Sequence, residues 1–307
     1  LATTDVPPSL FDLHPFDPNY FPAAIRNLVT MSPGLIAVIM LATIIYRKRD
    51  MYRQYKLTVV FLTFGGFSLA IPILLFNVFM VIVIHQRPQF LISTLACSLI
   101  KQFCAATMNS SFAISCAISI LRYALVMHDK EMKMFHLLAA YFFVAAPLYF
   151  YFILAFFVGT IRKNDECPFF IEIEWDIRPI IYFGYLALII LITDFCNIRV
   201  LWFLIQHKRR MSTQCVINEQ FTRKERDQLH LSIGLLVQSI TVTCTFGSTI
   251  LFMLLFSYGI SVPAWLSTIT NTLSSISTLL NPLSAVIFIR PFRREMLRTI
   301  TCSKVFQ

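Results

Sequence analysis

Eight cysteines are the first side chains in this sequence whose chemistry can be interpreted. Cysteines form lasting disulfides only in an oxidising compartment. If the chain crosses a membrane as its hydropathy predicts, only two cysteines lie near the oxidising side, and Cys97 and Cys167 are therefore predicted to form a bond. The alternative is a pair of unrelated thiols. The remaining cysteines are expected to be thiols: Cys104, Cys116, Cys196, Cys215, Cys244 and Cys302.

A cation follows Cys97 at a distance that fits one membrane crossing. Arg122 lies 25 residues further along the chain, which is about 37 Å of helix at 1.5 Å per residue. One tilted helix would therefore hold a disulfide at one end and the pair Arg122-Tyr123 at the other. An arginine at a helix end most often only extends to the membrane surface, so that interpretation stands beside a functional one.

Asp194 is the one acidic residue predicted at membrane depth, and Arg199 follows five residues later. Charged groups at this depth are costly and usually functional. The two residues are expected either to satisfy each other locally, across about one turn of helix, or to take part in a conformational switch.

Catalytic and metal-binding chemistry is not indicated elsewhere. The six histidines all lie in loops or at the ends of apolar stretches, without the spacing of metal ligands, so no metal or other cofactor is expected. No apolar stretch holds paired carboxylates or a Ser/His set, so no enzymatic activity is expected. The net charge of +10 includes no long basic run, so nucleic-acid binding is not expected either.

The elements that position these residues follow from composition. Hydrophobic residues make up 57% of the 307 residues and charged residues 14%, against about 45–50% and about 25% in an ordinary soluble domain. A membrane-spanning helix needs about 20 predominantly apolar residues. Seven stretches satisfy this requirement, and they predict an all-α bundle of seven transmembrane helices: Asn27–Tyr46, Leu57–Ile84, Phe90–Leu125, His136–Val158, Pro179–Ile205, Leu229–Tyr258 and Val262–Ile289.

The distribution of basic residues predicts the orientation of the bundle. Of the 26 lysines and arginines, 19 lie in alternate connections and the C-terminal segment, and basic connections stay on the cytoplasmic side. Residues 1–26 are therefore predicted to be extracellular, residues 27–289 to form the transmembrane domain, and residues 290–307 to be cytoplasmic.

The end of the chain adds two features. Asn281-Pro282 predicts a hinge in the seventh stretch, because proline frees a backbone carbonyl, although such kinks are common in membrane helices. Residues 290–300 place apolar and basic side chains on opposite faces, which predicts a short helix lying flat on the membrane. Cys302, just beyond, is expected to be either palmitoylated or an unmodified thiol.

Together these features resemble the plan of the rhodopsin-like G-protein-coupled receptors. The resemblance rests on seven spans, an outer N-terminus, the two cysteines, Arg122-Tyr123, Asn281-Pro282 and the amphipathic C-terminal helix. Some positions depart from the common pattern. Leu121 replaces the usual acidic residue before the arginine, Ala285 replaces a tyrosine, the second span lacks its aspartate, and the sixth lacks its tryptophan and proline. With this pattern of departures, the sequence resembles the divergent chemosensory receptors of nematodes.

The resemblance implies a function. An odorant-like small molecule from outside would shift the bundle to a state that activates a heterotrimeric G protein, with Arg122, Tyr123, Asn281 and Pro282 in the switch. The chain would lie in the plasma membrane, in contact with lipid, in a sensory cilium for example. The alternatives are a ligand-gated seven-helix channel or transporter and a membrane enzyme. Channels of the insect odorant type have the opposite orientation, and transporters usually carry internal repeats.

A ligand pocket is predicted from periodicity in the third span. Residues at three- and four-residue spacing form one stripe that runs inward from Cys97, although ordinary helix packing would produce a similar stripe. A lysine in this stripe could equally extend outward to lipid headgroups. The predicted pocket combines this stripe with residues at matching depth in the seventh span: Lys101, Cys104, Met108, Phe112, Trp265, Thr268 and Asn271.

Overall fold

The structure is a computed structural model of residues 1–307. It describes nearly all of residues 9–47, 53–128, 133–162, 170–173 and 177–213, and separate short stretches and single residues between 232 and 293. Structural statements below concern these residues. The predicted site residues Cys167, Thr268, Asn271, Asn281, Pro282 and Cys302 lie outside them.

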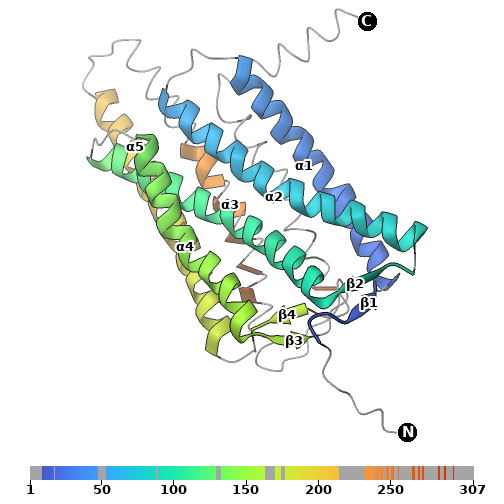
Figure 1. Ribbon diagram of the computed structural model, residues 1–307. Helices are drawn as coiled ribbons and strands as arrows, with labels where there is room; N and C mark the ends of the chain where they lie inside the picture. The colour runs from blue at the N-terminus through green and yellow to red at the C-terminus, as the bar shows by residue number, and fades with distance from the viewer. Residues whose placement is uncertain are drawn as a thin grey trace, which may run out of the picture.

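Five long helices account for most of the described chain (Figure 1). All five are long and apolar enough to cross a membrane. They overlap the first five predicted spans, which confirms those spans, but their ends differ. The first helix begins at Phe21 instead of Asn27, so the end of the predicted extracellular segment is helical, and the fifth continues to Thr213 beyond the predicted end at Ile205. The helices are α1 Phe21–Arg47, α2 Arg53–Gln86, α3 Thr94–His128, α4 Met134–Val158 and α5 Ile177–Thr213.

The sixth and seventh predicted spans are described only in part. Every described residue from 232 onward is helical, including a short apolar helix over Ser232–Thr241. Leu235 of this helix packs in one apolar cluster with residues of α1, α2, α3 and α4, among them Leu41, Ile114 and Leu137. This contact fixes the sixth segment against the bundle.

The third helix is the centre of the bundle. Half of the residues in its most apolar segment are buried, against 28–39% in the other four helices. It contacts α2, α4 and α5 along its length. The outward faces of the other helices instead expose large apolar side chains, including Phe143 and Phe157 of α4 and Leu191 of α5, as expected for surfaces that face lipid.

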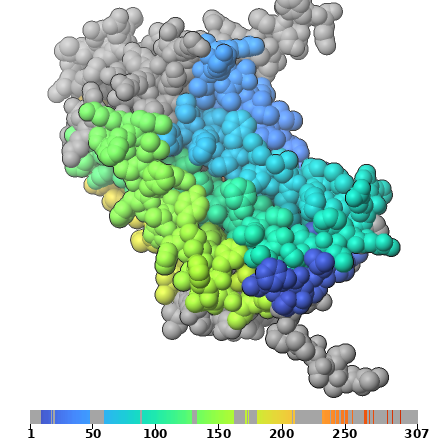
Figure 2. Space-filling model, in the orientation of Figure 1, coloured from blue at the N-terminus to red at the C-terminus, as the bar shows by residue number. Residues whose placement is uncertain are grey.

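Two short antiparallel pairs of strands lie at one end of the bundle, called here the hairpin end (Figure 1). Strand β1 (Leu13–Pro15), which precedes a 3-10 turn over Pro18–Tyr20, pairs with β2 (Leu91–Ser93). Strand β3 (Thr160–Arg162) pairs with β4 (Phe170–Glu172). Figure 2 shows the segment that contains β1, in dark blue, packed against the start of α3 in blue-green. The strands at the hairpin end therefore come from the segment before α1, the α2–α3 connection and the α4–α5 connection.

Strand β4 is fixed directly to α3. The backbone N–H of Ile171 donates to Ser98 Oγ at 2.9 Å, and Gln102 Nε2 donates to the carbonyl of Ile171 at 3.0 Å. Ile171 and Ile173 are both buried beneath the strand. These contacts hold the β3–β4 hairpin across α3 near its first turns.

Candidate functional site

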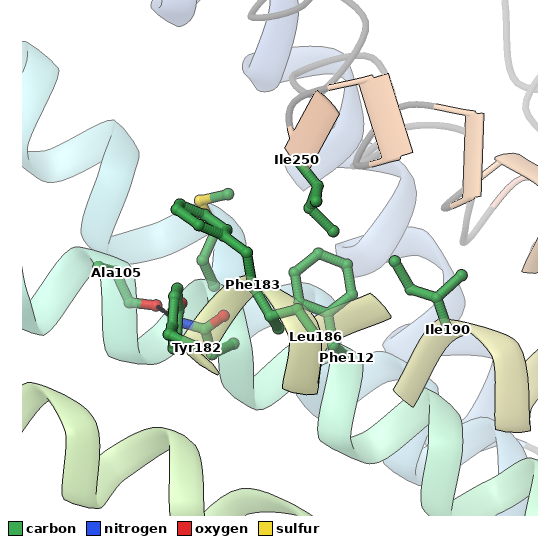
Figure 3. A pocket seen from close by; sticks show the side chains of 9 residues that line it. Ala105, Phe112, Tyr182, Phe183, Leu186, Ile190 and Ile250 are labelled. Atoms are coloured by element: carbon green, nitrogen blue, oxygen red, sulfur yellow. Dashed lines mark hydrogen bonds between the residues drawn. The ribbon is translucent and has the colours of Figure 1, made fainter. Parts of the chain in front are cut away.

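A cavity of about 120 Å3 lies between α3, α5 and the sixth segment. Figure 3 shows side chains from all three elements pointing into it. The α3 wall has residues at positions 105, 108, 109 and 112, which lie on one face of a helix because they repeat at three- and four-residue spacing. The lining residues are Ala105, Met108, Asn109, Phe112, Tyr182, Phe183, Leu186, Ile190 and Ile250.

The polar groups of this cavity are one amide and one phenol. Asn109 is almost fully buried, and its Nδ2 donates to the carbonyl of Ala105 at 2.7 Å, the bond dashed in Figure 3. The side chain of Asn109 also interacts with the hydroxyl of Tyr182. None of the nine lining residues carries a charge. A small apolar molecule with one neutral polar group suits such a cavity, because a bound ion would have no counter-charge there.

The predicted pocket agrees with this cavity only in part. Met108 and Phe112 line it, whereas Lys101 and Cys104 are half-buried and lie outside its lining. Trp265 is 61% exposed and is not a lining residue either. The roles of all these residues in binding, and those of Thr268 and Asn271, stay predictions.

Sequence reasoning missed Asn109 and the aromatic pair Tyr182-Phe183. In the sequence, Asn109-Ser110-Ser111 fits the glycosylation pattern, but no glycan could be attached at membrane depth. A buried amide next to Met108 on the predicted stripe was a usable signal, since an amide in hydrocarbon needs a partner. No comparable pattern in α5 indicated which of its many aromatic residues face inward.

Arg122, at the other end of α3, is buried and does not extend to the membrane surface. Only 5% of its side chain is exposed, and its Nη2 donates to Ser232 Oγ at 3.0 Å. Ser232 is itself 2% exposed. Tyr123 instead faces α5, with its ring 6.4 Å from that of Phe195. The bond between Arg122 and Ser232 thus joins α3 to the sixth segment inside the bundle.

Asp194 makes a second connection to the sixth segment. Its carboxylate accepts a bond from Thr243 Oγ1 at 2.7 Å and another from Ser239 Oγ. The predicted local pair with Arg199 is therefore wrong: the Arg199 guanidinium lies over the ring of Trp202, 5.3 Å from its centroid. The hydroxyls of Ser239 and Thr243 bind the carboxylate in place of Arg199 because they lie on a neighbouring helix at the same depth. A part in a switch stays a prediction.

The three hydroxyl partners share one helical face. Ser232, Ser239 and Thr243 are spaced by seven and four residues, which places them on a single stripe of a helix. Arg122 on α3 and Asp194 on α5 both bind this stripe. The sixth segment is therefore held to α3 by a hydrogen bond from Arg122 and to α5 by hydrogen bonds to Asp194, in addition to apolar packing.

Cys97 is disulfide-bonded, while Cys104, Cys116, Cys196 and Cys244 are thiols. The pairing of Cys97 with Cys167 stays a prediction because Cys167 is not among the described residues. Strand β4 begins three residues after Cys167 and is bound to Ser98, the neighbour of Cys97. Within the described part of the chain, no three histidine, cysteine or acidic side chains are grouped closely enough to hold a metal ion.

Comparison with known structures defines the class of protein. The crystal structure of squid rhodopsin matches with a TM-score of 0.73 over 95% of this chain and 88% of that chain, at 17% sequence identity. At this identity the likeness establishes the fold. The chain is thus a multi-pass membrane protein with the seven-helix fold of rhodopsin.

Sequence comparison gives the family. The chain belongs to the family described as "Protein of unknown function (DUF1182)", whose model matches residues 20–207. A relative from Caenorhabditis elegans, "Uncharacterized protein ZK757.1", is 23% identical over 258 residues, which is 83% of this chain and 76% of the relative. The matched family region extends from the first helix to the end of the apolar part of α5.

Proposed function

We propose that this protein is a G-protein-coupled chemosensory receptor of the plasma membrane. An uncharged small molecule binds in the cavity between α3, α5 and the sixth segment, and the bundle then activates a heterotrimeric G protein at the end that carries Arg122. In this proposal the hairpin end is extracellular, Arg122 and Tyr123 belong to the switch with Asn281 and Pro282, and the chain itself catalyses no reaction. The relative from a nematode is compatible with the sensory role.

One observation carries the proposal: the cavity and the buried arginine are joined by the same two elements. Phe112 lines the cavity and Arg122 lies ten residues further along α3, about 15 Å away. Ile250 lines the cavity and Ser232 of the same segment binds Arg122. A ligand that shifts the sixth segment against α3 would therefore disturb the bond between Arg122 and Ser232, because both contacts belong to one pair of packed elements.

The proposal is tested by expressing the chain in cells with a sensor for dissociation of Gα from Gβγ, one Gα class at a time. The cells are exposed to a broad panel of neutral odorants. For any agonist found, Met108→Trp should weaken potency about tenfold or more, equivalent to about 1.4 kcal/mol, because the indole fills the cavity. Phe103→Trp is the matched control, since Phe103 also lies on α3 but is 60% exposed on its outer face.

Two results would count against the proposal. One is the absence of any response across all Gα classes at surface expression equal to that of a working receptor. The other is an equal effect of Met108→Trp and Phe103→Trp on potency, which would place the ligand outside the cavity.

A further inference from the structure

A second hollow of about 290 Å3 lies between α4 and α5, close to the hairpin end. It is a groove on the side of the bundle. Its walls are apolar and aromatic, and they include Leu154 and Tyr151 from α4 and Ile181, Tyr182 and Tyr185 from α5.

The groove opens toward lipid. Phe150 and Ile181 at its edges are 63% and 65% exposed, and both belong to segments that are long and apolar enough to cross the membrane. Any molecule that reaches the groove from this side therefore comes from the hydrocarbon phase and is uncharged there.

The two helices carry a proline and an interhelical hydrogen bond beside the groove. Pro147, which lines it, lies inside α4 and cannot donate a backbone hydrogen bond to the preceding turn, so α4 is disposed to bend there. Tyr185 of α5 donates its hydroxyl to the carbonyl of Val144 at 3.2 Å. This bond ties the helices together at the floor of the groove.

Tyr182 separates the groove from the interior cavity, because it lines both hollows. On the groove side its ring stacks on that of Tyr151, with centroids 4.3 Å apart and planes at 17°. On the cavity side its hydroxyl interacts with the side chain of Asn109. Among the described residues, Tyr182 is the one that lines both hollows, and its contacts there are ring stacking and a hydrogen bond.

On the α3 side, strand β4 covers the approach to the cavity from the hairpin end. Strand β4 crosses α3 at Ser98 and Gln102, and Gln102 lies one turn before Ala105 at the cavity wall. Ile171 and Ile173 are buried at this point. The backbone N–H and the carbonyl of Ile171 are both hydrogen-bonded to side chains of α3, so displacing the hairpin would break two hydrogen bonds.

We infer that the groove between α4 and α5 is a lateral entrance, through which a neutral, membrane-dissolved ligand passes Tyr182 into the cavity. The chemical class is an apolar alcohol, aldehyde or ketone, whose one polar group matches Asn109 and the Tyr182 hydroxyl. The inference rests on the proposed function for the identity of the cavity as the ligand site. It adds the route and the requirement that the ligand partition into lipid.

The test uses the full chain reconstituted in lipid vesicles and a long-chain alcohol that carries a photoreactive diazirine. The probe is added to the vesicles, samples are irradiated at successive times, and labelled peptides are quantified by mass spectrometry. Label should appear first on the peptides with Tyr151 and Ile181 and later on the peptide with Met108 and Phe112. Leu154→Trp and Ile181→Trp, which fill the groove from opposite walls, should each slow labelling of the cavity by about tenfold or more.

Ile153→Trp is the matched control, because Ile153 is the neighbour of Leu154 but is exposed and lies outside the groove lining. It should leave the labelling rate unchanged. The inference would be overturned if the cavity were labelled at the same rate in Leu154→Trp and Ile181→Trp as in the unmodified chain. It would also be overturned if the residues that line the groove carried no more label than Ile153. The readout does not involve a G protein, so a failed entrance is distinguished from a failed receptor function.

Discussion

At the scale of single residues, the structure explains how Arg122 is held without an acidic neighbour. Leu121 stands where rhodopsin-like receptors usually have an acidic residue, so the arginine lacks an adjacent ion pair, and the sequence alone did not indicate its partner. Ser232, which lies 110 residues further along the chain, supplies a hydroxyl that accepts a hydrogen bond from the guanidinium. A contact between residues so far apart depends on how helices pack, so no local motif could predict it.

The same reasoning applies to Asp194, whose position at membrane depth was predicted but whose partners were not. Short sequence spacing offered Arg199 as one of two alternatives, yet the carboxylate binds two hydroxyls of another element. We therefore expect that Thr243→Val, which keeps the side-chain shape and removes one hydroxyl, lowers the free energy of unfolding by about 0.6–1.7 kcal/mol. Denaturant unfolding in detergent measures this change.

Thr63→Val is the control for that substitution. The hydroxyl of Thr63 is also buried, but it donates to the carbonyl of Val59 in its own helix, an acceptor already used by the helix backbone. Removing the Thr63 hydroxyl should lower the free energy of unfolding clearly less than removing the Thr243 hydroxyl. Equal losses for the two variants would mean that the Asp194 bonds do not stabilise the sixth segment.

At the scale of elements, hydropathy located the helices but not their ends. The start of α3 is a clear case. The predicted span begins at Phe90, whereas the helix begins at Thr94, because Leu91–Ser93 pair with β1 and Ser93 Oγ then accepts a bond from the N–H of Ala96 as an N-cap. Strand pairing with a segment some 75 residues earlier leaves no periodic signal in three residues, so both strand pairs were missed.

Close packing of α1 on α2 gives a prediction at this scale. A Cβ atom on Gly66 would lie 2.7 Å from Val38 Cγ2, and valine is stiff about χ1, so the helices would have to separate. The clash in Gly66→Ala should therefore lower the free energy of unfolding by about 1–3 kcal/mol. The gain in helix propensity from alanine offsets part of this loss. The melting temperature in detergent should fall.

Gly184→Ala provides the matched control, since a Cβ atom there would meet nothing within 4 Å. This variant gains helix propensity of about 1 kcal/mol without a clash, and its melting temperature should hold or rise. A melting temperature for Gly66→Ala at or above that of Gly184→Ala would show that the α1–α2 contact is not tight.

The β3–β4 hairpin leads to a prediction about the disulfide. Because β4 is anchored beside Cys97 and begins three residues after Cys167, we expect Cys97 and Cys167 to be bonded to each other. Mass mapping of non-reduced peptides from surface-expressed protein should recover the two cysteines in one linked peptide. Recovery of Cys167 as a thiol, or of Cys97 linked to another cysteine, would refute the pairing.

At the scale of the whole molecule, composition and seven apolar stretches were sufficient to predict the seven-helix bundle, and the match to squid rhodopsin supports it. The candidate site was less predictable. The α3 stripe identified Met108 and Phe112 because one helix has a fixed period, but the facing residues depend on the rotation of α5 and of the sixth segment. Helix rotation is set by packing against several neighbours at once, which a single sequence does not specify.

We propose that this bundle activates a G protein through Arg122, and the bond between Arg122 and Ser232 allows a test that needs no ligand. If the bond restrains the resting state, Ser232→Ala should raise basal activation, by about threefold for a typical hydrogen bond of about 0.6 kcal/mol within a membrane. Adding Arg122→Ala to this variant should abolish the increase, because the guanidinium is the group proposed to engage the G protein.

The measurement is the basal rate of GTP exchange on purified heterotrimers, one Gα class at a time, with membranes that contain equal amounts of the unmodified chain, Ser232→Ala or Ser232→Ala/Arg122→Ala. With at least one Gα class, we expect the exchange rate to be highest for Ser232→Ala, lower for the unmodified chain and at background for the double variant. Exchange at the background of receptor-free membranes for all three proteins, with every Gα class, would contradict this proposal.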